Sequence, residues 1–387
     1  MKTPLRVVIL RSNALDPDPR VEKIAASLGG AGYAVTALGW DMQGRSTDGN
    51  TPPNQQGGQV RWLRLPLRAV FGRGLYNLGH ELRWQVTLFN WLRRQRQAFD
   101  WLHACDFDTL LPALLCRWLW RKAVIYDIFD FYADMLRRTP LPIKALVRAA
   151  ELQAIGQADA VILADDCRTT QIAGSRPKRL AVIYNALDDR RVGSPAGRPA
   201  HSRLHLAYVG NLQVERGLMH LLAVLRRCPQ WTLALAGFGS DEALLRQEAA
   251  SLPNVTWYGR VPYEQALQLE AAADVLLATY DPAIPNHRFS SPNKVFEAML
   301  LGKPILAARG TNVDSIVERA NCGLVVAYGD EAALEVALLR LQDDPSLRQQ
   351  LGANARRAFE SNYNWPNMQT RLVALYRELE NTLRPSP

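Results

Sequence analysis

The chain has 387 residues, of which 48% are hydrophobic and 21% charged, and its formal net charge is +9. This composition is typical of globular proteins and excludes a disordered chain, and the length predicts two domains rather than one core. No apolar run reaches the ~18 residues of a membrane-spanning helix. The opening MKTPLRVVIL lacks the cleavage site of a signal peptide, so we expect no leader.

The basic balance favours anionic partners such as phosphates, nucleic acid or an acidic membrane surface. Basic residues mix with Trp, Phe or apolar residues in three stretches of the first half, 83–99, 117–122 and 136–150. Two interpretations stay open for them, namely helices that lie on anionic lipid and solvated helix faces with their aromatic residues in the core. The five cysteines are scattered and form no CxxC pair, so we expect no zinc site, no disulfide framework and a reducing cytoplasm.

Apolar strands alternate with helix patterns along the first half, which predicts a parallel α/β sheet. The predicted strands are 6–11, 34–40, 60–65, 101–105, 123–128, 160–164 and 180–186. The clearest predicted helices are 75–98, one that ends at Trp120, and about 143–158. Residues 44–58 are rich in Gly, Pro, Asn and Gln and predict a mobile loop.

Residues 187–203 have no apolar periodicity and contain several Gly and Pro residues, so they predict a linker. The alternation then restarts, with predicted strands at 204–210, 231–237, 254–259, 274–280, 304–308 and 323–327. The predicted domains are therefore 1–186 and 204–363, followed by a helix at 364–387 that we expect to pack back on the first domain. Ligands of such sheets bind at the carboxyl ends of the strands, so a shared cleft is expected.

The segment 289–304, FSSPNKVFEAMLLGKP, is the most informative one. It places Lys294 and Glu297 on one face of the first turns of an apolar helix, where free N–H groups and the helix dipole attract an anion. The lysine suits a phosphate, and Glu297 suits two neighbouring ribose hydroxyls. The alternative is a Ser291 N-cap with Pro292 at N1 and an ordinary ion pair.

Weaker signals follow the strands of the second half. Gly210 ends one predicted strand and Arg216 precedes the next helix, while Gly237 and Gly239 repeat the glycine turn. Taken alone, each of these is better explained by an ordinary turn between a strand and a helix. Arg260 and Val261 follow another strand, where backbone groups would be able to pair with a base, although a plain loop is the alternative.

Five segments of the second half, taken in order, resemble the nucleotide domain of the GT-B retaining glycosyltransferases of family 4, in an SPNK-type subgroup. They are YVGNLQVERGL, LALAGFGSDEALL, NVTWYGRVPYEQA, ADVLLATYDP and SPNKVFEAMLLGKPIL. The first half agrees through DPDPRVEKIAASLGGAGYAVTALGWD, HACDFDTLLPALL and AVIYDIFDFYADM. The resemblance implies two Rossmann-like domains and transfer of a sugar, with retention, from a nucleotide-diphospho-sugar to an acceptor hydroxyl. It also implies that cations, rather than a metal ion, stabilise the leaving diphosphate.

Residue roles follow from the same resemblance. Glu297 would hold the ribose, and the catalytic group would consist of Arg216, Lys294, Asp106 and His103. The nucleotide-sugar would be held by Gly210, Asn211, Arg216, Gly237, Gly239, Arg260, Val261, Ser291, Asn293, Lys294 and Glu297. Asp106 and Asp130 are expected to bind acceptor hydroxyls or to be helix N-caps. Arg20 and Glu22 are weaker candidates for the cleft.

Three departures from the family pattern bear on the chemistry. Phe289 stands where the family often has a second Glu, Asn211 replaces an Arg after Gly210, and Cys105 replaces the second His of His-x-His-Asp. These departures concern the donor sugar and the catalytic contacts.

The leading hypothesis is a metal-independent hexosyltransferase that uses a UDP- or GDP-linked sugar and no further cofactor. It would act on a lipid-linked or surface-polysaccharide precursor, as a cytoplasmic protein peripheral to the inner face of the membrane. The alternatives are a sugar-nucleotide epimerase of the same fold or a non-catalytic nucleotide-sugar-binding protein. Nucleic acid is not an expected partner, because no basic stripe with stacking aromatic residues is evident.

Overall fold

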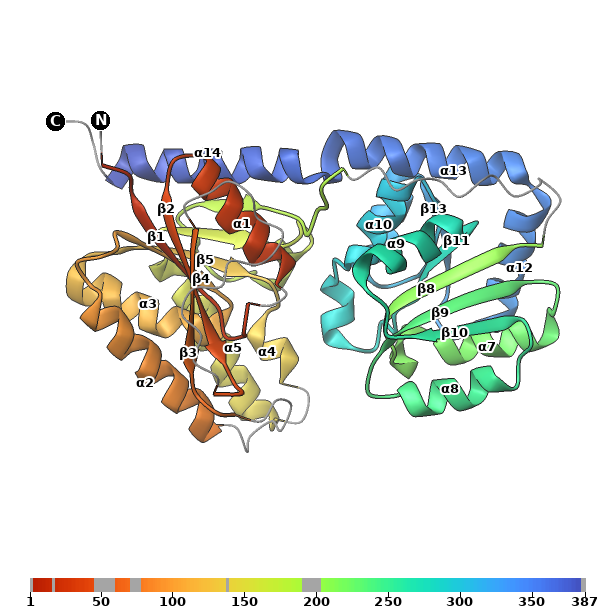
Figure 1. Ribbon diagram of the computed structural model, residues 1–387, viewed down its shortest axis with the longest axis horizontal. Helices are drawn as coiled ribbons and strands as arrows, with labels where there is room; N and C mark the ends of the chain where they lie inside the picture. The colour runs from red at the N-terminus through yellow and green to blue at the C-terminus, as the bar shows by residue number, and fades with distance from the viewer. Residues whose placement is uncertain are drawn as a thin grey trace. The chain divides into compact units, whose positions relative to one another are not determined.

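The computed structural model describes residues 3–15, 18–44, 60–69, 78–136, 139–189 and 203–383. They form two compact units, one of residues 1–184 and 368–387 and the other of residues 185–367 (Figure 1). Each unit is built on one parallel sheet flanked by helices, which confirms the predicted fold class. Residues 45–58 of the predicted loop and 190–202 of the predicted linker lie outside the described residues.

The sheet of the first unit has the order β3-β2-β1-β4-β5-β6-β7 with every pair parallel. Its strands are β1 (Arg6–Leu10), β2 (Ala34–Asp41), β3 (Val60–Pro66), β4 (Trp101–Cys105), β5 (Ala123–Ile128), β6 (Ala160–Leu163) and β7 (Leu180–Val182). The predicted strand 180–186 is too long. The N–H of Ile183 still donates to Leu163 of β6 at 2.9 Å, but beyond it the pairing ends. The carbonyl of Ile183 accepts from Arg20, and the N–H of Tyr184 donates to the sulfur of Met368.

Helices cover both faces of this sheet. They are α1 (Pro19–Gly30), α2 (Leu78–Arg94), α3 (Phe107–Trp120), α4 (Tyr132–Met135), α5 (Leu141–Gln157) and α6 (Arg168–Gln171). Side chains alternate along a strand, so Leu102 and Ala104 share a core with α2, α3 and α5. His103, between them, points to the opposite face.

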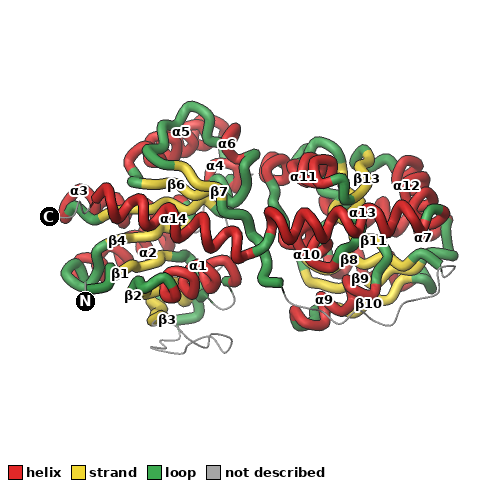
Figure 2. The backbone as a smooth tube through the Cα atoms, turned by 90° about the horizontal axis from the view of Figure 1, so that it is seen from above, coloured by secondary structure: helices red, strands yellow, loops and turns green. Residues whose placement is uncertain are grey.

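Helix α14 (Trp365–Leu383) begins in the second unit and continues beside the sheet of the first, as Figures 1 and 2 both show. Its Tyr376 is fully buried and packs against the rings of Tyr33 and Trp101, with centroids 5.4 and 5.6 Å apart. Contacts of this kind hold residues 368–383 in the core of the first unit.

The sheet of the second unit has the order β10-β9-β8-β11-β12-β13. Its strands are β8 (His205–Asn211), β9 (Thr232–Phe238), β10 (Val255–Gly259), β11 (Val275–Ala278), β12 (Ile305–Ala308) and β13 (Gly323–Val326). The helices are α7 (Leu218–Arg227), α8 (Glu242–Ala250), α9 (Tyr263–Ala272), α10 (Asn293–Leu301), α11 (Asn312–Ala320), α12 (Glu331–Asp343) and α13 (Pro345–Ala358), with single turns η2 (Val214–Arg216), η3 (Pro285–Phe289) and η4 (Phe359–Tyr363).

Both sheets have a point where the strand order reverses. It lies between β1 and β4 in the first unit and between β8 and β11 in the second. Ligands of doubly wound sheets bind outside the carboxyl ends of the strands at such points. The two sheet edges are therefore the places where functional side chains are expected.

Candidate functional site

Helix α10 begins beside the reversal point of the second unit. Its N-cap is Pro292 and its first residue is Asn293, so the alternative with Ser291 as N-cap and Pro292 at N1 is wrong by one residue. No side chain caps this end of the helix. Ser291 is buried, and its hydroxyl has no hydrogen-bond partner among the described residues, whereas Asn293 is exposed. The first turn therefore keeps N–H groups available to an anion.

Lys294 follows in the first turn and is only 8% exposed. Its Nζ donates to the backbone carbonyl of Val209 at 3.0 Å and lies 3.3 Å from the centroid of the Tyr208 ring. The added Cβ of a residue at position 210 would lie 3.5 Å from that Nζ, so Gly210 leaves the ammonium room at the end of β8. Burial lowers the pKa of Lys294, and the nearby carboxyl groups of Glu270 and Glu297 oppose that shift.

Glu297 lies one turn further along α10 and is 9% exposed, so the predicted pair does share a buried face. Glu270, on α9, is a second buried carboxyl in the same group and is 3% exposed. Burial and the neighbouring Glu297 raise the pKa of Glu270 well above its usual value, and Lys294 acts in the opposite direction. Sequence analysis did not identify Glu270.

Arg216 ends η2 on the other side of the reversal point. Its guanidinium carbon lies 4.4 Å from the centroid of the Tyr280 ring, which follows β11. Its Nε is buried and has no hydrogen-bond partner among the described residues. Arg216 is also one of the charges that influence Lys294, so two cations converge here from different elements.

Three glycines make close packing of the strand ends possible. A Cβ at Gly237, where φ is +142°, would lie 1.8 Å from the carbonyl oxygen of Gly210, and one at Gly239 would lie 2.2 Å from that of Leu212. No side chain fits at either position. Asn211 is exposed at the end of β8, with its side-chain oxygen beside Gly239. The loops after β8 and β9 therefore pack backbone against backbone.

Two further predicted residues lie at the β10 end of this edge. Arg260 is exposed, and its guanidinium carbon lies 4.6 Å from the centroid of the Phe238 ring at the end of β9. Val261 is half-buried beside it. They share the sheet edge with Gly237. Phe289, at the end of η3, is half-buried.

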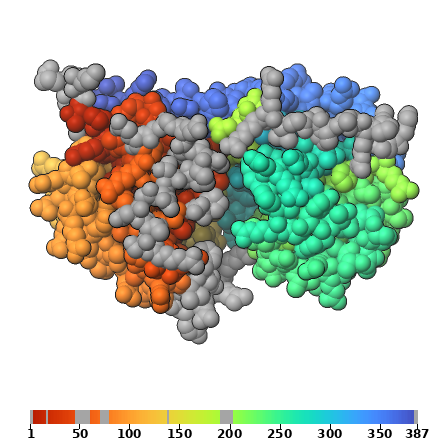
Figure 3. All heavy atoms as spheres, viewed as in Figure 1, coloured from red at the N-terminus to blue at the C-terminus, as the bar shows by residue number. Residues whose placement is uncertain are grey.

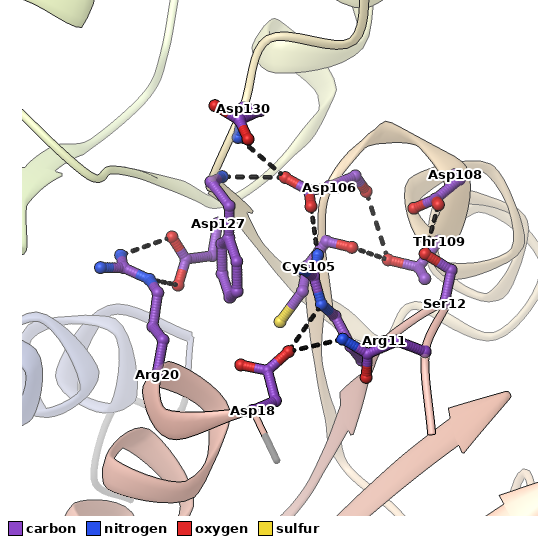
Figure 4. A network of polar contacts seen from close by, with 12 residues as sticks. Arg11, Ser12, Asp18, Arg20, Cys105, Asp106, Asp108, Thr109, Asp127 and Asp130 are labelled. Carbon is purple, nitrogen blue, oxygen red and sulfur yellow. Dashed lines mark hydrogen bonds and ion pairs between the residues drawn. The ribbon is translucent and has the colours of Figure 1, made fainter. Parts of the chain in front are cut away.

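The reversal point of the first unit holds a network of charges (Figure 4). Arg11, just after β1, forms ion pairs with Asp18 at 2.9 Å and with Asp106. Asp106 also accepts from the backbone N–H groups of Phe129, at 2.8 Å, and Asp130, at 3.2 Å. Its carboxylate is thus occupied by three donors.

Asp106 occupies the N-cap position of α3, as one of the two interpretations predicted, but its side chain does not cap the helix. Its φ of +64° with a ψ of 168° is a backbone conformation found almost only in glycine, so the surrounding contacts must hold it. Asp130 is not an N-cap, because Phe131 holds that position at α4. Asp130 instead pairs with Arg168 at 3.0 Å and its side chain is 42% exposed.

His103 is fully buried within β4, and both of its ring nitrogens have partners. Nδ1 lies 2.8 Å from the Tyr376 hydroxyl and Nε2 lies 3.3 Å from Asp127. Arg20 donates to the same Asp127 at 2.8 Å and, like Asp127, is buried. Burial acts to raise the pKa of Asp127, but Arg20 and His103 outweigh it and the pKa lies below its usual value. These bonds join strands to helices, and they give His103 the surroundings of a core histidine rather than those of an exposed base.

The remaining candidates of the first unit have local roles. Glu22 accepts from the backbone N–H of Asp18 at 3.2 Å, while Asp18 accepts from that of Val21, so the pair caps α1 reciprocally. Cys105 is fully buried, and burial raises the pKa of its thiol well above the usual value. In the part of the chain that the structure describes, no group of three His, Cys, Asp or Glu side chains has the arrangement of a metal site.

Comparison with known proteins identifies the family. Residues 17–186 match the family described as "Glycosyl transferase 4-like domain", and residues 203–344 match "Glycosyl transferases group 1". The chain belongs to the GT-B glycosyltransferases. The solved sucrose-phosphate synthase of Thermosynechococcus elongatus has a TM-score of 0.75 at 20% identity, over 97% of this chain and all of that one. Anabaena HepE, solved with UDP and glucose, has a TM-score of 0.70 at 17% identity with the same coverage.

Curated relatives of this GT-B chain have glycosyltransferase names. Glycogen synthase of Mycobacterium tuberculosis is 26% identical over 240 residues, which is 59% of this chain and 56% of the relative. The D-rhamnosyltransferase WbpZ of Pseudomonas aeruginosa is 26% identical over 242 residues, 59% of this chain and 61% of the relative. The matched region thus spans less than two thirds of these relatives.

Proposed function

We propose that this GT-B protein transfers a sugar from a nucleoside-diphospho-sugar to an acceptor hydroxyl, with retention of the anomeric configuration. The observation that carries the proposal is the convergence of Lys294, Arg216 and Glu297 at the open start of α10, beside Gly210. Two cations and a helix N-terminus suit a diphosphate, and a buried carboxylate suits the ribose hydroxyls. HepE, a structural neighbour, is described with UDP and with UDP-glucose, which supports a UDP-linked donor; a GDP-linked donor is the other candidate.

In the proposed reaction the acceptor oxygen bonds to the anomeric carbon as the bond from that carbon to the diphosphate breaks. The diphosphate leaves with the electron pair, and the acceptor proton passes to one of its oxygens on the same face of the sugar. Negative charge grows on the diphosphate, where Lys294 and Arg216 stabilise it. Fixed cations supply this charge in the proposal, and no cofactor takes part in a step. Asp106 and His103 receive no catalytic role in it, because their polar atoms have partners within the unit.

Thermal unfolding with UDP, GDP, dTDP, CMP and AMP tests the donor site. A ligand at about 100 times its Kd adds about 2.7 kcal/mol of stability. We expect one nucleoside diphosphate to stabilise the protein and Glu297→Ala or Lys294→Met to lose the effect. Glu318→Ala, which alters a half-exposed carboxylate on α11, is the control. No stabilisation by any nucleotide, together with no sugar transfer from UDP- or GDP-sugars to a lipid extract, would contradict the proposal.

The same assay separates the alternatives. Binding of a nucleoside diphosphate without any sugar transfer would favour a non-catalytic nucleotide-sugar-binding protein. Isomerisation of the bound sugar without an acceptor would favour an epimerase. Transfer to an extracted lipid or glycan, with the anomeric configuration of the product determined by NMR, would establish both the activity and its stereochemistry.

We also propose that the acceptor is presented at an anionic membrane surface. No helix among the described residues is long and apolar enough to cross a bilayer. Helices α2, α3 and α5 nevertheless expose large apolar side chains to the outside. We call this set of side chains the outer layer; its members are Leu82, Val86, Leu111, Trp118, Leu119, Leu141, Ile143 and Leu146. Leu141 is 80% exposed and Leu146 is 70% exposed.

Exposed cations accompany this outer layer. They are Arg83, Arg93 and Arg94 on α2, Arg96 just after it, and Arg121 at the end of α3. Part of this region, orange in the space-filling view, forms one flank of the first unit (Figure 3). Apolar side chains with arginines around them suit the headgroup region of an anionic bilayer, where each cation near the surface contributes about 1 kcal/mol. The proposed location is therefore the inner face of the cytoplasmic membrane.

Co-sedimentation with vesicles tests the membrane proposal. We expect binding to vesicles that contain phosphatidylglycerol, weaker binding to pure phosphatidylcholine, and loss of binding at high salt. Trp118→Ser with Leu119→Ser should weaken binding several-fold. Val336→Ser, which replaces a 65%-exposed residue on α12 of the second unit, is the matched control. Equal binding by all variants would rule out the outer layer as the docking surface.

A further inference from the structure

The donor edge contains one carboxyl group more than the proposed reaction uses. Glu270 and Glu297 both lie beside Lys294, where helix α9 packs against α10, and all three side chains are less than a tenth exposed. One oxygen of Glu270, Oε2, is buried with no hydrogen-bond partner among the described residues. A buried polar atom without a hydrogen-bond partner needs a physical explanation.

Charge balance provides one. The ionisable groups that face Lys294 are Glu297 on its own helix, Glu270 from α9 and Arg216 from η2, and the Tyr208 ring of β8 lies against its ammonium. Two buried carboxylates in one site repel each other, so one of them is strongly favoured to hold a proton. A neutral acid tolerates burial without a partner far better than a carboxylate does, so Glu270 is the group that holds it.

We propose that Glu270 is a positioning residue of the donor site, a neutral acid that leaves Glu297 as the only carboxylate beside Lys294. Glu297 then keeps its charge for the ribose hydroxyls, and the diphosphate meets Lys294 without competition from a second anion. This role rests on the proposed function, because it concerns the same nucleotide site. The raised pKa of Glu270 and its cause agree with it.

The test is the Kd of the stabilising nucleoside diphosphate, measured by calorimetry from pH 6 to pH 9 for the wild type, Glu270→Gln and Glu270→Ala. Glutamine has nearly the shape of the neutral acid and cannot ionise, so it should restore most of the affinity that alanine loses. The ligand's own ionisation is the same for all the proteins, so it cancels in the ratio of wild-type to Gln-variant Kd. Glu264→Gln, at an exposed site in the first turn of the same helix, is the matched control.

We expect this Kd ratio to stay near one around pH 7, because glutamine reproduces the neutral acid, and to rise above one only where the pH is high enough to ionise Glu270. The control ratio should stay near one throughout. A ratio that departs from one by about threefold or more at pH 7 would overturn the proposal. A value below one would show that Glu270 is an ionised counter-ion, and a value above one would show that it is ionised and repels the ligand. If the wild type binds no nucleoside diphosphate at any pH, the proposed donor site itself is wrong. That result is distinct from a failure of the Glu270 proposal alone.

Discussion

The two sheet edges hold charged residues in opposite ways. At the reversal point of the first unit two carboxylates are matched by donors, since Asp106 accepts from Arg11 and two backbone N–H groups and Asp127 accepts from Arg20. At the edge of the second unit the buried charged groups are less fully matched. Lys294 Nζ donates to a backbone carbonyl, and Arg216 Nε and Glu270 Oε2 have no partner among the described residues.

The difference shows how each edge keeps its shape. A satisfied network is rigid without a ligand, whereas an edge with unmatched buried groups gains most from a ligand that supplies the missing partners. The second unit compensates through its backbone, because the glycine contacts fix the strand ends without polar side chains. Substitutions in the two edges should therefore fail for different reasons.

The largest effect is expected where the second unit depends on backbone contact. Gly237→Ala would place a Cβ 1.8 Å from the carbonyl oxygen of Gly210, so the ends of β8 and β9 must separate. We expect a loss of about 3 kcal/mol of stability and of nucleoside-diphosphate binding. Gly30→Ala, where the added Cβ meets nothing within 4 Å, is the control for thermal unfolding and calorimetry. Normal stability of Gly237→Ala would show that the loops yield easily.

Substitutions at the edge of the first unit should instead destabilise it by removing the partners of its charged groups. Asp106→Ala leaves Arg11 without one of its ion pairs and two backbone N–H groups without an acceptor, and it places alanine at a φ of +64°. We expect a loss of about 2 kcal/mol in denaturant unfolding. Asp106→Asn, which keeps one acceptor oxygen for the two backbone N–H groups, should lose less. Equal losses for both variants would mean that the charge of Asp106, rather than its acceptor geometry, sustains the edge.

Only part of this contrast between the two edges could be predicted from the sequence. The spacing of Lys294 and Glu297 predicted a shared helix face because helical periodicity is local, and the strand alternation predicted both sheets. The satisfaction of His103 was not predictable, since its partner Tyr376 lies 273 positions away on α14. Glu270 left a fainter signal, a carboxyl group on the apolar stripe that Ala266, Leu267 and Ala271 form on α9. Its neighbours come from another helix, so its role depends on the fold.

The smallest effect concerns a carboxylate of the first unit, Asp108, whose charge matching is incomplete. Asp108 accepts from Ser12, but its Oδ1 is buried without a partner among the described residues. Burial and the nearby Asp106 raise the pKa of Asp108 to about 7 from a usual value of 3.8. The folded state thus binds this proton more tightly than the unfolded state, so stability is full below about pH 4 and falls as the pH rises through about 7.

Asp108→Asn removes that titration while its amide oxygen can still accept from Ser12. We expect the variant to unfold at a higher temperature than the wild type at pH 8, by a few degrees, and the difference to shrink steadily towards pH 4.5. Glu378→Gln, which neutralises an exposed acid of the same unit, should show no such trend. A pH-independent difference for Asp108→Asn would mean that Asp108 is ionised in the folded protein and that its charge is matched, like those around it, by Arg11.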